Sequence, residues 1–451
     1  MNIVLTNNPS DRGGRFAAAR ADCACDCQCA CPVDGLPLPV LSLPAAYYLE
    51  LTPACNNACP GCGNVYAHAG PNLPRPLDGA GWQNLIARLA AHAQQFKITG
   101  GEPTLHPDLE EIVRAVDRLA VPFTLFTNGR WDDAGALLEL LQGLNVFDGF
   151  LISLHGPDAA THEAFSGVRG SFVQTVANVR RAAQAGFDVA LSIVITQRNF
   201  NRIKETLDLA LRLGANHLVC NRLIGAGRDG LTPDDAQLRA AMVAVESLRA
   251  RGQPIRFGNC IPQCFEASSS TGCTAGSTFA TIDPWGRMRP CNHAPLIAGD
   301  LLSHSVEAVW RGAAMARWRD LGPRACHACA AFAVCHGGCR AQAMLIGAAQ
   351  DPLMRSPLSQ TPVRPPFELP LFAGLRPIAA WDDRGRDEQG VLLSKGVALP
   401  VPPDYASLLS RLDGAWTLRR IEREYDHAAL NWVGALYREG LVAWASNSCF
   451  S

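Results

Sequence analysis

Between about residue 47 and residue 221, the chain alternates short apolar runs with longer stretches of helical periodicity. The short runs are rich in β-branched and aromatic residues, which is typical of strands: "YYLEL", "FKIT", "FTLFT", "GFLIS", "VALSIVI" and "HLVCN". Between the first two runs, Trp82, Leu85, Ile86 and Leu89 recur at the spacing of a helix with one buried face. Strands and helices that alternate with short connections predict right-handed crossovers and a parallel sheet.

The number of these units limits the architecture. Six strand–helix units are fewer than the eight of a closed barrel, so we expect an α/β fold with a partial (β/α)6 TIM-like barrel. In such folds the reactive groups lie on loops at the C-terminal ends of the strands. The segment from Cys55 to Cys62 directly follows the first strand-like run. This loop is therefore the first place to look for chemistry.

Outside this stretch the pattern changes, and we predict five parts. They are an N-terminal arm at 1–45, the partial barrel at 46–255, a region rich in glycine, proline and cysteine at 256–350, a proline-rich linker at 351–373 and a small module at 374–451. In the last part, a strand-like "GVLLSK", three helical runs and a closing "LVAWA" predict a small winged-helix-like α+β domain.

Composition and charge narrow the class of partner. Of the 451 residues, 48% are hydrophobic, and 40 basic side chains stand against 41 acidic ones. A net charge of -1 lacks the basic surface of a protein that binds nucleic acid or an anionic membrane. We find no signal-peptide pattern at the N-terminus and no apolar run of membrane-spanning length. We therefore expect a cytoplasmic globular protein that has neither nucleic acid nor membrane as a partner.

The cysteine content changes this picture. A reducing cytosol keeps thiols reduced, so the 18 cysteines indicate metal ligation or redox chemistry rather than structural disulfides. A secreted disulfide scaffold is the alternative, but such scaffolds are usually small domains. Five of the cysteines alternate near the N-terminus, namely Cys23, Cys25, Cys27, Cys29 and Cys31. On an extended strand their thiols would share one side, which suits a soft metal, a segment that is itself modified, or a flexible arm with incidental thiols.

Cys55, Cys59 and Cys62 have a C-x3-C-x2-C spacing. A [4Fe–4S] cluster normally takes four thiolates, so three cysteines leave one iron open, as in catalytic rather than structural sites. On a loop after the first strand of a partial barrel, this motif resembles that of the radical S-adenosylmethionine (SAM) superfamily. The resemblance implies that the methionine part of SAM chelates the open iron. It also implies a flavodoxin- or ferredoxin-type reductant and release of a 5′-deoxyadenosyl radical.

Later motifs extend the resemblance. "TGGEP" ends the second strand and is similar to the superfamily's GGEP motif, which implies cofactor contacts from Gly100, Gly101, Glu102 and Pro103. Asn128, Ser153 and Arg169 lie where relatives place contacts to the ribose and carboxylate of SAM. Each has a structural alternative: a turn at Asn128, a strand-end hydroxyl at Ser153 and a solvated side chain at Arg169. The order of the motifs along the chain favours the cofactor interpretation.

A second group of cysteines follows the barrel and resembles the SPASM extension of radical SAM enzymes that modify peptides. The resemblance implies two auxiliary clusters. One would use Cys273, Cys291 and Cys339 with Cys264 or Cys260 as the fourth ligand, and the other would use Cys326, Cys329 and Cys335. The alternative is a pair of structural zinc sites, which C-x2-C spacing also fits. Cys220, within the sixth strand, is expected to be an ordinary buried residue.

The chain departs from the SPASM pattern at its last cysteine. That residue usually follows an Asp-Pro pair, but here "DPLM" places Met354 in its position, and the next cysteine is Cys449. The second auxiliary cluster could then have Asp351 or another oxygen ligand, an open iron or a long-range thiolate, or it could be absent. An open iron could bind substrate, whereas a closed cluster would pass electrons.

The C-terminal module resembles the PqqD-like peptide-recognition domain of peptide natural-product maturases, in which a leader peptide adds as a strand. Together these resemblances predict a radical SAM enzyme that abstracts hydrogen from a ribosomally made precursor peptide and installs a cross-link or similar modification. Excision and epimerisation remain open as outcomes. One alternative is a radical SAM enzyme that acts on a small molecule or porphyrinoid precursor. The other is a non-enzymatic iron–sulfur electron carrier or scaffold, which has no need of an open iron beside "TGGEP".

Overall fold

The computed structural model describes residues 40–67, 69, 72–225, 230–267, 269, 272–360, 377–380, 391–394, 397–438 and 441–444. The alternating N-terminal cysteines, Cys449 and most of the predicted proline-rich linker lie outside these residues. Leu43–Pro362 forms one compact unit, and the described segments from Pro377 onward belong to a second. Each unit is considered by itself.

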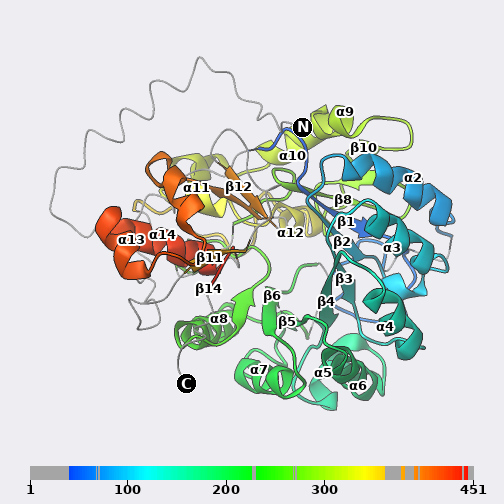
Figure 1. Cartoon of the computed structure of the whole chain (residues 1–451). Helices are drawn as coiled ribbons and strands as arrows, with labels where there is room; N and C mark the ends of the chain where they lie inside the picture. The colour runs from blue at the N-terminus through cyan, green and yellow to red at the C-terminus, as the bar shows by residue number, and fades with distance from the viewer. Residues whose placement is uncertain are drawn as a thin grey trace. The chain divides into compact units, whose positions relative to one another are not determined.

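The larger unit contains a curved sheet whose strands follow the six predicted runs (Figure 1). Neighbouring strands pair in parallel and in sequence order. They are β1 (Ala46–Glu50), β2 (Gln95–Thr99), β3 (Phe123–Thr127), β4 (Phe147–Ser153), β5 (Val189–Ile195) and β6 (His217–Arg222). The partial barrel predicted from the sequence is confirmed, and all C-terminal strand ends lie at one edge of the sheet.

Four short strands extend the sheet beyond the six predicted ones. On one side β7 (Ile255–Phe257) pairs in parallel with β6, and on the other β8 (Phe279–Ile282) pairs in parallel with β1. Two antiparallel strands, β9 (Arg287–Arg289) and β10 (Gly299–Asp300), follow β8. The sequence analysis missed them because runs of two to four residues carry no periodicity. Since β8 lies beside β1, the barrel and the cysteine-rich region share one sheet. The domain boundary predicted at residue 255 stays a prediction.

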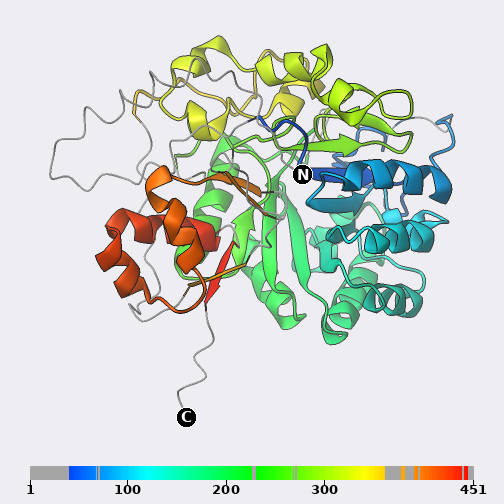
Figure 2. The ribbon, with the colours of Figure 1, turned by 45° about the horizontal axis from the view of Figure 1, so that its top comes forward.

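Helices between the strands pack on the outer face of the sheet (Figures 1 and 2). Trp82, Leu85, Ile86 and Leu89 are buried, as their spacing predicts. Aspartates cap several of these helices, as Asp234 does with a full capping box. The helices are α2 (Gly79–Ala90), α3 (Leu109–Arg118), α4 (Ala134–Gln142), α5 (Ala159–Ser166), α6 (Ser171–Gln184), α7 (Ile203–Arg212) and α8 (Asp235–Ala250). None in the described part of the chain is long and apolar enough to cross a membrane.

The cysteine-rich region consists of short helices and turns. Trp310 and Trp318 are its largest buried side chains, and Trp318 packs in a small cluster that includes Cys291 and Cys339. Its helices are α9 (Val306–Trp310), α10 (Ala313–Asp320), the 3-10 helix η4 (Arg324–Ala328), α11 (Phe332–Cys335) and α12 (Arg340–Leu345). Four of its eight cysteines lie on or beside these short helices, namely Cys326, Cys329, Cys335 and Cys339.

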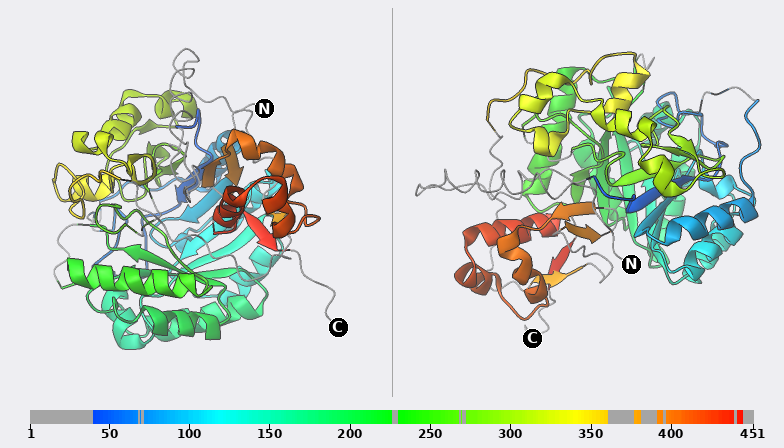
Figure 3. Two further views of the ribbon diagram at one scale, coloured as in Figure 1. Left: turned by 90° about the vertical axis from the view of Figure 1, so that its left-hand side faces the viewer. Right: turned by 90° about the horizontal axis from the view of Figure 1, so that it is seen from above.

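The C-terminal unit is a small α+β module (Figure 3). It has a core of its own, which includes Leu408, Ile421 and Trp432. The predicted strands and the last two helices are present, but the first helical run forms a 3-10 helix, "PDYASLLSR". Its elements are β11 (Pro377–Ala379), β12 (Val391–Ser394), β13 (Val397–Pro400), η6 (Pro403–Arg411), α13 (Leu418–Glu424), α14 (His427–Arg438) and β14 (Val442–Trp444). Two antiparallel pairs form, β11 with β14 and β12 with β13, while the winged-helix-like arrangement stays a prediction.

Candidate active site

The loop after β1 brings three thiols close together. Cys55 is exposed, whereas Cys59 and Cys62 are partly buried. The Cys62 amide donates to the Cys59 carbonyl at 3.2 Å, which closes a tight turn. Burial, and then the nearby Cys62 and Cys55 thiols, raise the pKa of Cys59 to about 12. Three thiols this close together are the donor set of an iron–sulfur centre, and a bound cluster would stabilise their thiolates.

The end of β2 fixes the start of this loop. Gly101 donates its amide to the Thr52 carbonyl and Glu102 donates its amide to the Ala54 carbonyl, both at 2.7 Å. A Cβ atom on Gly101 would lie 2.2 Å from the Ala54 carbonyl oxygen. Glycine is therefore required here by close approach of backbone to backbone, and the "TGGEP" segment supports the cysteine loop directly.

Glu102 ties the end of β2 to the end of β3. Its carboxylate is fully buried and accepts hydrogen bonds from the Thr104 hydroxyl at 2.8 Å, the Thr127 hydroxyl at 2.7 Å and the Asn128 amide at 2.7 Å. The Thr104 amide donates a further bond at 3.2 Å. Burial is the largest effect and raises the pKa of this carboxyl above its ordinary value, although the hydrogen bonds offset part of the rise. The carboxylate thus holds two strand ends in register beside the thiols, and it begins the 3-10 helix η3 (Pro103–Leu105).

Asn128 connects β3 to the thiol loop. Its side-chain amide donates to Asn56 Oδ1 at 2.6 Å and lies 3.8 Å from Cys55 Sγ. Arg130, which the sequence analysis did not single out, donates to the Asn56 carbonyl and, at 2.8 Å, to Asn57 Oδ1. The signal for Arg130 in the sequence was its position directly after the "TNG" motif. Arg130 holds the loop that carries Cys55.

Helix α5 closes the other side of the loop. The Ala58 amide donates to the Ser166 carbonyl at 2.9 Å, and a Cβ on Gly167 would lie 2.4 Å from the Ala58 carbonyl oxygen. Gly167 also has a left-handed φ of 71°. The three thiols are therefore supported by the ends of β2, β3 and α5, which lie far apart in the sequence.

Two further predicted cofactor contacts lie at the end of β4 and after α5. Ser153 is the last residue of β4, half-buried and in register with Ser192. Arg169 is exposed in the connection between α5 and α6. Their proposed contacts to SAM stay predictions.

The cysteine-rich region contains two further groups of thiols. In the first, Cys260, Cys291 and Cys339 are buried and Cys273 is partly buried. Burial raises the pKa of Cys339 to about 12, with the neighbouring Cys273 as the next cause, and burial followed by Cys339 and Cys273 also raises the pKa of Cys291. The pKa of Cys260 is raised by burial and then by Cys273 and Cys339. Cys273, Cys291 and Cys339 also pack in one small cluster, so these thiols lie close to one another.

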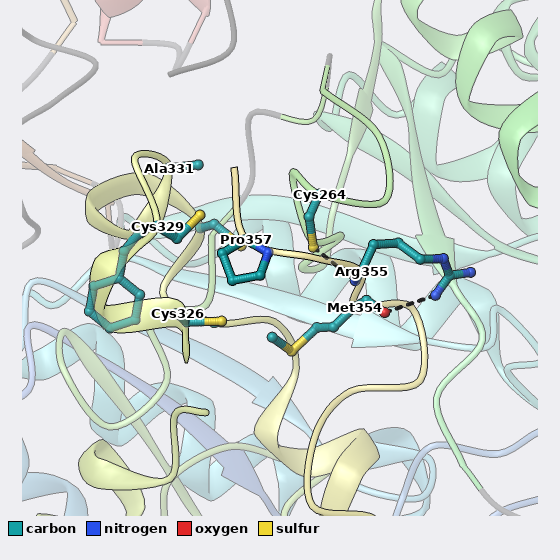
Figure 4. A pocket seen from close by; sticks show the side chains of 10 residues that line it. Cys264, Cys326, Cys329, Ala331, Met354, Arg355 and Pro357 are labelled. Carbon is teal, nitrogen blue, oxygen red and sulfur yellow. Dashed lines mark hydrogen bonds between the residues drawn. The ribbon is translucent and has the colours of Figure 1, made fainter. Parts of the chain in front are cut away.

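The second group consists of Cys264, Cys326, Cys329 and Cys335. These cysteines line one pocket together with Met354 (Figure 4). Backbone amides donate to two of the sulfurs, from Arg355 to Cys264 Sγ at 3.1 Å and from Leu358 to Cys329 Sγ at 3.3 Å. Such hydrogen bonds to sulfur are typical of iron–sulfur ligands. No group of three or more His, Cys, Asp or Glu side chains in the described ranges is arranged to hold a single metal ion.

Together, the partial barrel, the three-thiol loop supported by "TGGEP" and the two outlying thiol groups define an iron–sulfur enzyme of the TIM-barrel-like class. Comparisons with known proteins agree with this class. Residues 49–210 match the model of the radical SAM superfamily, and residues 273–331 match that of the SPASM iron-sulfur cluster-binding domain. The chain belongs to the radical SAM superfamily and is a radical SAM enzyme that uses [4Fe–4S] clusters and SAM.

Relatives and solved structures are similar over most of the chain. "PqqA peptide cyclase" of Ruegeria pomeroyi is 30% identical over 72% of this chain and 92% of its own length. The protein of that name from Xanthomonas campestris pv. campestris is 32% identical over 70% and 88%. Among structures, Streptococcus suis SuiB bound to S-adenosylmethionine has a TM-score of 0.58 at 17% identity, covering 70% of this chain and 78% of SuiB. Native anSMEcpe with bound AdoMet and Cp18Cys peptide has a TM-score of 0.54 at 15% identity over 68% and 92%.

Proposed function

We propose that this enzyme modifies a ribosomally made precursor peptide by abstracting hydrogen from one of its residues and installing a cross-link or a similar modification. The observation that supports the proposal is the alignment with PqqA peptide cyclases over 92% and 88% of their own lengths, which spans more than a shared barrel. When bound, the cluster and SAM supply the 5′-deoxyadenosyl radical.

The chain's own residues hold the reactants in place. Cys55, Cys59 and Cys62 would ligate the cluster, and Gly100 and Gly101 let the end of β2 pack closely against the backbone at the start of the cysteine loop. Glu102 and Asn128 fix the loop through hydrogen bonds at the ends of β2 and β3. Catalysis here depends on positioning one C–H bond of the substrate and on excluding water, because the cofactor carries the reactive chemistry.

We propose further that the C-terminal unit binds the leader part of the peptide by strand addition, as a PqqD-like domain would. Its two described sheets, β11 with β14 and β12 with β13, each have two strands. Short sheets of this kind offer backbone edges to which an extended peptide can pair. A flavodoxin- or ferredoxin-type protein would supply the electron.

The experiment is an anaerobic turnover assay with SAM, a chemical reductant and a short peptide encoded beside the enzyme's gene. We expect 5′-deoxyadenosine to form and the peptide to lose the mass of two hydrogen atoms for each cross-link, as measured by mass spectrometry. The triple variant Cys55→Ala, Cys59→Ala, Cys62→Ala is the control and should produce neither. If 5′-deoxyadenosine forms but every such peptide stays unmodified while a small-molecule precursor is consumed, the peptide proposal is wrong.

Removal of residues 363–451 tests the role of the C-terminal unit separately. Because this segment lies outside the compact unit Leu43–Pro362, the shortened enzyme should still cleave SAM. We expect its peptide turnover to need a much higher peptide concentration, with the intact chain as control. An unchanged KM for the peptide would exclude strand addition to this unit.

A further inference from the structure

The Cys264 side chain lies with the second auxiliary group of thiols, not with the first. It lines one pocket with Cys326, Cys329 and Cys335. Figure 4 shows the side chains of Cys264, Cys326 and Cys329 around this pocket, with Met354 beside them. By contrast, Cys260 is not among the residues that line this pocket. The Arg222 guanidinium donates to the Cys260 carbonyl at 3.5 Å and also binds the Asp351 carboxylate, which accepts from the Cys339 amide.

The segment that would carry the usual last cysteine has a different function in this chain. Met354, in the position of that cysteine, is buried and its thioether lines the same pocket. The next residue, Arg355, donates its backbone amide to Cys264 Sγ at 3.1 Å, and Leu358 donates to Cys329 Sγ at 3.3 Å. The segment thus supplies hydrogen bonds to sulfur, while the thiol comes from a different element.

The sequence left open whether Asp351 is an oxygen ligand of the second auxiliary cluster, but its carboxylate is engaged in other contacts. Its two carboxylate oxygens accept from the Arg222 guanidinium at 2.7 and 2.9 Å, in an ion pair that is almost completely buried. The Cys339 amide donates to the same carboxylate at 2.7 Å. A carboxylate bound in this way cannot turn toward the second thiol group without leaving a buried guanidinium unpaired.

A backbone turn holds Cys264 at the edge of this pocket. The Phe265 and Glu266 amides donate to the Pro262 carbonyl at 2.9 and 3.1 Å. The Arg239 and Arg355 guanidinium groups lie over the Phe265 ring, 4.0 and 5.3 Å from its centroid. Stacking on both cations fixes the residue next to Cys264, so the thiol is held toward the pocket.

We propose that Cys264 is the fourth thiolate of the second auxiliary cluster, in place of the cysteine that Met354 replaces. On binding, the thiol releases its proton to solvent and forms one iron–sulfur bond, and no electron is transferred. Cys260 then completes the first cluster with Cys273, Cys291 and Cys339. A cluster with four thiolates has no open iron for substrate, so its role is electron transfer. This inference rests on the iron–sulfur assignment and not on the peptide substrate.

The test pairs substitutions in the full-length protein, reconstituted anaerobically with iron and sulfide. Two ligands lost from one cluster remove that cluster alone, whereas one ligand lost from each cluster affects both. In the background without Cys55, Cys59 and Cys62, about eight irons should remain. We expect Cys264→Ala with Cys326→Ala to leave about four irons. Cys264→Ala with Cys291→Ala should leave either about eight, if single losses are tolerated, or almost none.

If instead Cys264→Ala with Cys291→Ala leaves about four irons, and Cys264→Ala with Cys326→Ala leaves about eight or almost none, Cys264 belongs to the first cluster. Equal iron in both pairs would show that Cys264 is not a ligand. Either outcome overturns the proposal. Cys220→Ala, which removes a buried thiol of β6, is the control for loss of a cysteine as such.

A rescue variant guards against simple misfolding. Met354→Cys combined with Cys264→Ala returns a thiol to the pocket, so we expect iron and the electron paramagnetic resonance signal of the reduced cluster to return to wild-type values. Met354→Leu alone should change neither. If Met354→Leu loses the cluster as Cys264→Ala does, the thioether is the ligand and the proposal is wrong. None of these measurements uses a peptide, so their failure leaves the proposed substrate untouched.

Discussion

At the scale of single residues, the buried polar groups around the thiol loop determine where the loop lies. Glu102 alone accepts four hydrogen bonds, from residues of η3 and of the end of β3. In a buried site such bonds are costly to lose, because the partner is left without water to replace them. The "GGEP" glutamate was predicted to contact SAM, and the structure adds that it positions neighbouring strand ends.

Replacement of this carboxylate tests that role. Glu102→Gln keeps the shape of the side chain and one accepting oxygen, but its NH2 group replaces the other oxygen. With the remaining oxygen in the Oε1 position, the buried Asn128 amide has no acceptor. We expect the free energy of unfolding to fall by about 1–3 kcal/mol and the yield of 5′-deoxyadenosine to drop with it. Urea unfolding and the turnover assay measure the two effects. Glu110→Gln, at an exposed position on α3, is the control, and equal stability of both variants would contradict the prediction.

A second residue-scale prediction concerns pH. His162 is buried, and burial lowers its pKa to about 4. Its Nδ1 accepts from the His155 amide at 3.1 Å. Because the unfolded chain binds the proton more readily, the stabilising contribution of neutral His162 is complete above about pH 6.5 and decreases as the pH falls toward 4. The slope is at most about 1.4 kcal/mol per pH unit.

His162→Asn should remove this pH dependence, since its amide oxygen can accept the same hydrogen bond. The measurement is the difference in unfolding free energy between wild type and variant at several pH values between about 5 and about 7.5. His304→Asn, which alters an exposed histidine, should leave the wild-type slope unchanged. A difference that does not vary with pH would disprove the prediction.

At the scale of elements, the strand ends could be predicted and the loop contacts could not. The runs at β3 and β5 match the observed strands residue for residue, since β-branched and aromatic residues in short runs identify buried strands. That the end of α5 packs against the thiol loop depends on a turn at Gly167 and on close approach to Ala58. No local periodicity encodes a contact over more than a hundred residues.

The glycine at this turn gives an element-scale prediction. Gly167→Ala adds a Cβ 2.4 Å from the Ala58 carbonyl oxygen, so the thiol loop must shift. We expect the iron content to fall by about four atoms per chain and 5′-deoxyadenosine to disappear, while the auxiliary clusters stay. The measurements are iron analysis and the turnover assay.

Gly186→Ala is the matched control. Its φ of 86° carries the same left-handed strain, but a Cβ there meets nothing within 4 Å. Gly186→Ala should therefore lose only about 1–2 kcal/mol for the left-handed backbone. Gly167→Ala should lose more, and only Gly167→Ala should lose iron. Loss of iron from both would show that backbone strain, rather than contact with the loop, is responsible.

At the scale of the larger unit, buried ion pairs connect the barrel to the segments that follow it: Arg289 of β9 pairs with Glu50 of β1, and Arg222 pairs with Asp351. Arg222 ends β6, and Asp351 lies beyond α12 and accepts from the Cys339 amide. The contact spans 129 positions in the chain. The two regions therefore depend on each other for stability, in agreement with their shared sheet.

Asp351→Asn breaks this pair and leaves a buried guanidinium uncompensated. We expect a loss of about 3–5 kcal/mol in unfolding free energy, together with weaker retention of the auxiliary iron that Cys339 helps to hold. Denaturant unfolding and iron analysis after dialysis are the measurements. Asp208→Asn, in an exposed pair with Lys204, should cost less than about 1 kcal/mol. If the two variants are equally stable, the pair does not connect the regions.

The sequence by itself determined the α/β partial barrel, the radical SAM chemistry and the loop of Cys55, Cys59 and Cys62, because periodicity and short-range spacing are local properties of a chain. It also predicted which cysteines would hold the auxiliary clusters, but left the division of Cys260 and Cys264 between them open. Only the tertiary structure separated Cys260 from Cys264, gave Asp351 to Arg222 and placed Met354 beside a thiol group. Those outcomes depend on which distant segments pack together, and four residues of spacing between two cysteines cannot encode the direction in which each thiol points.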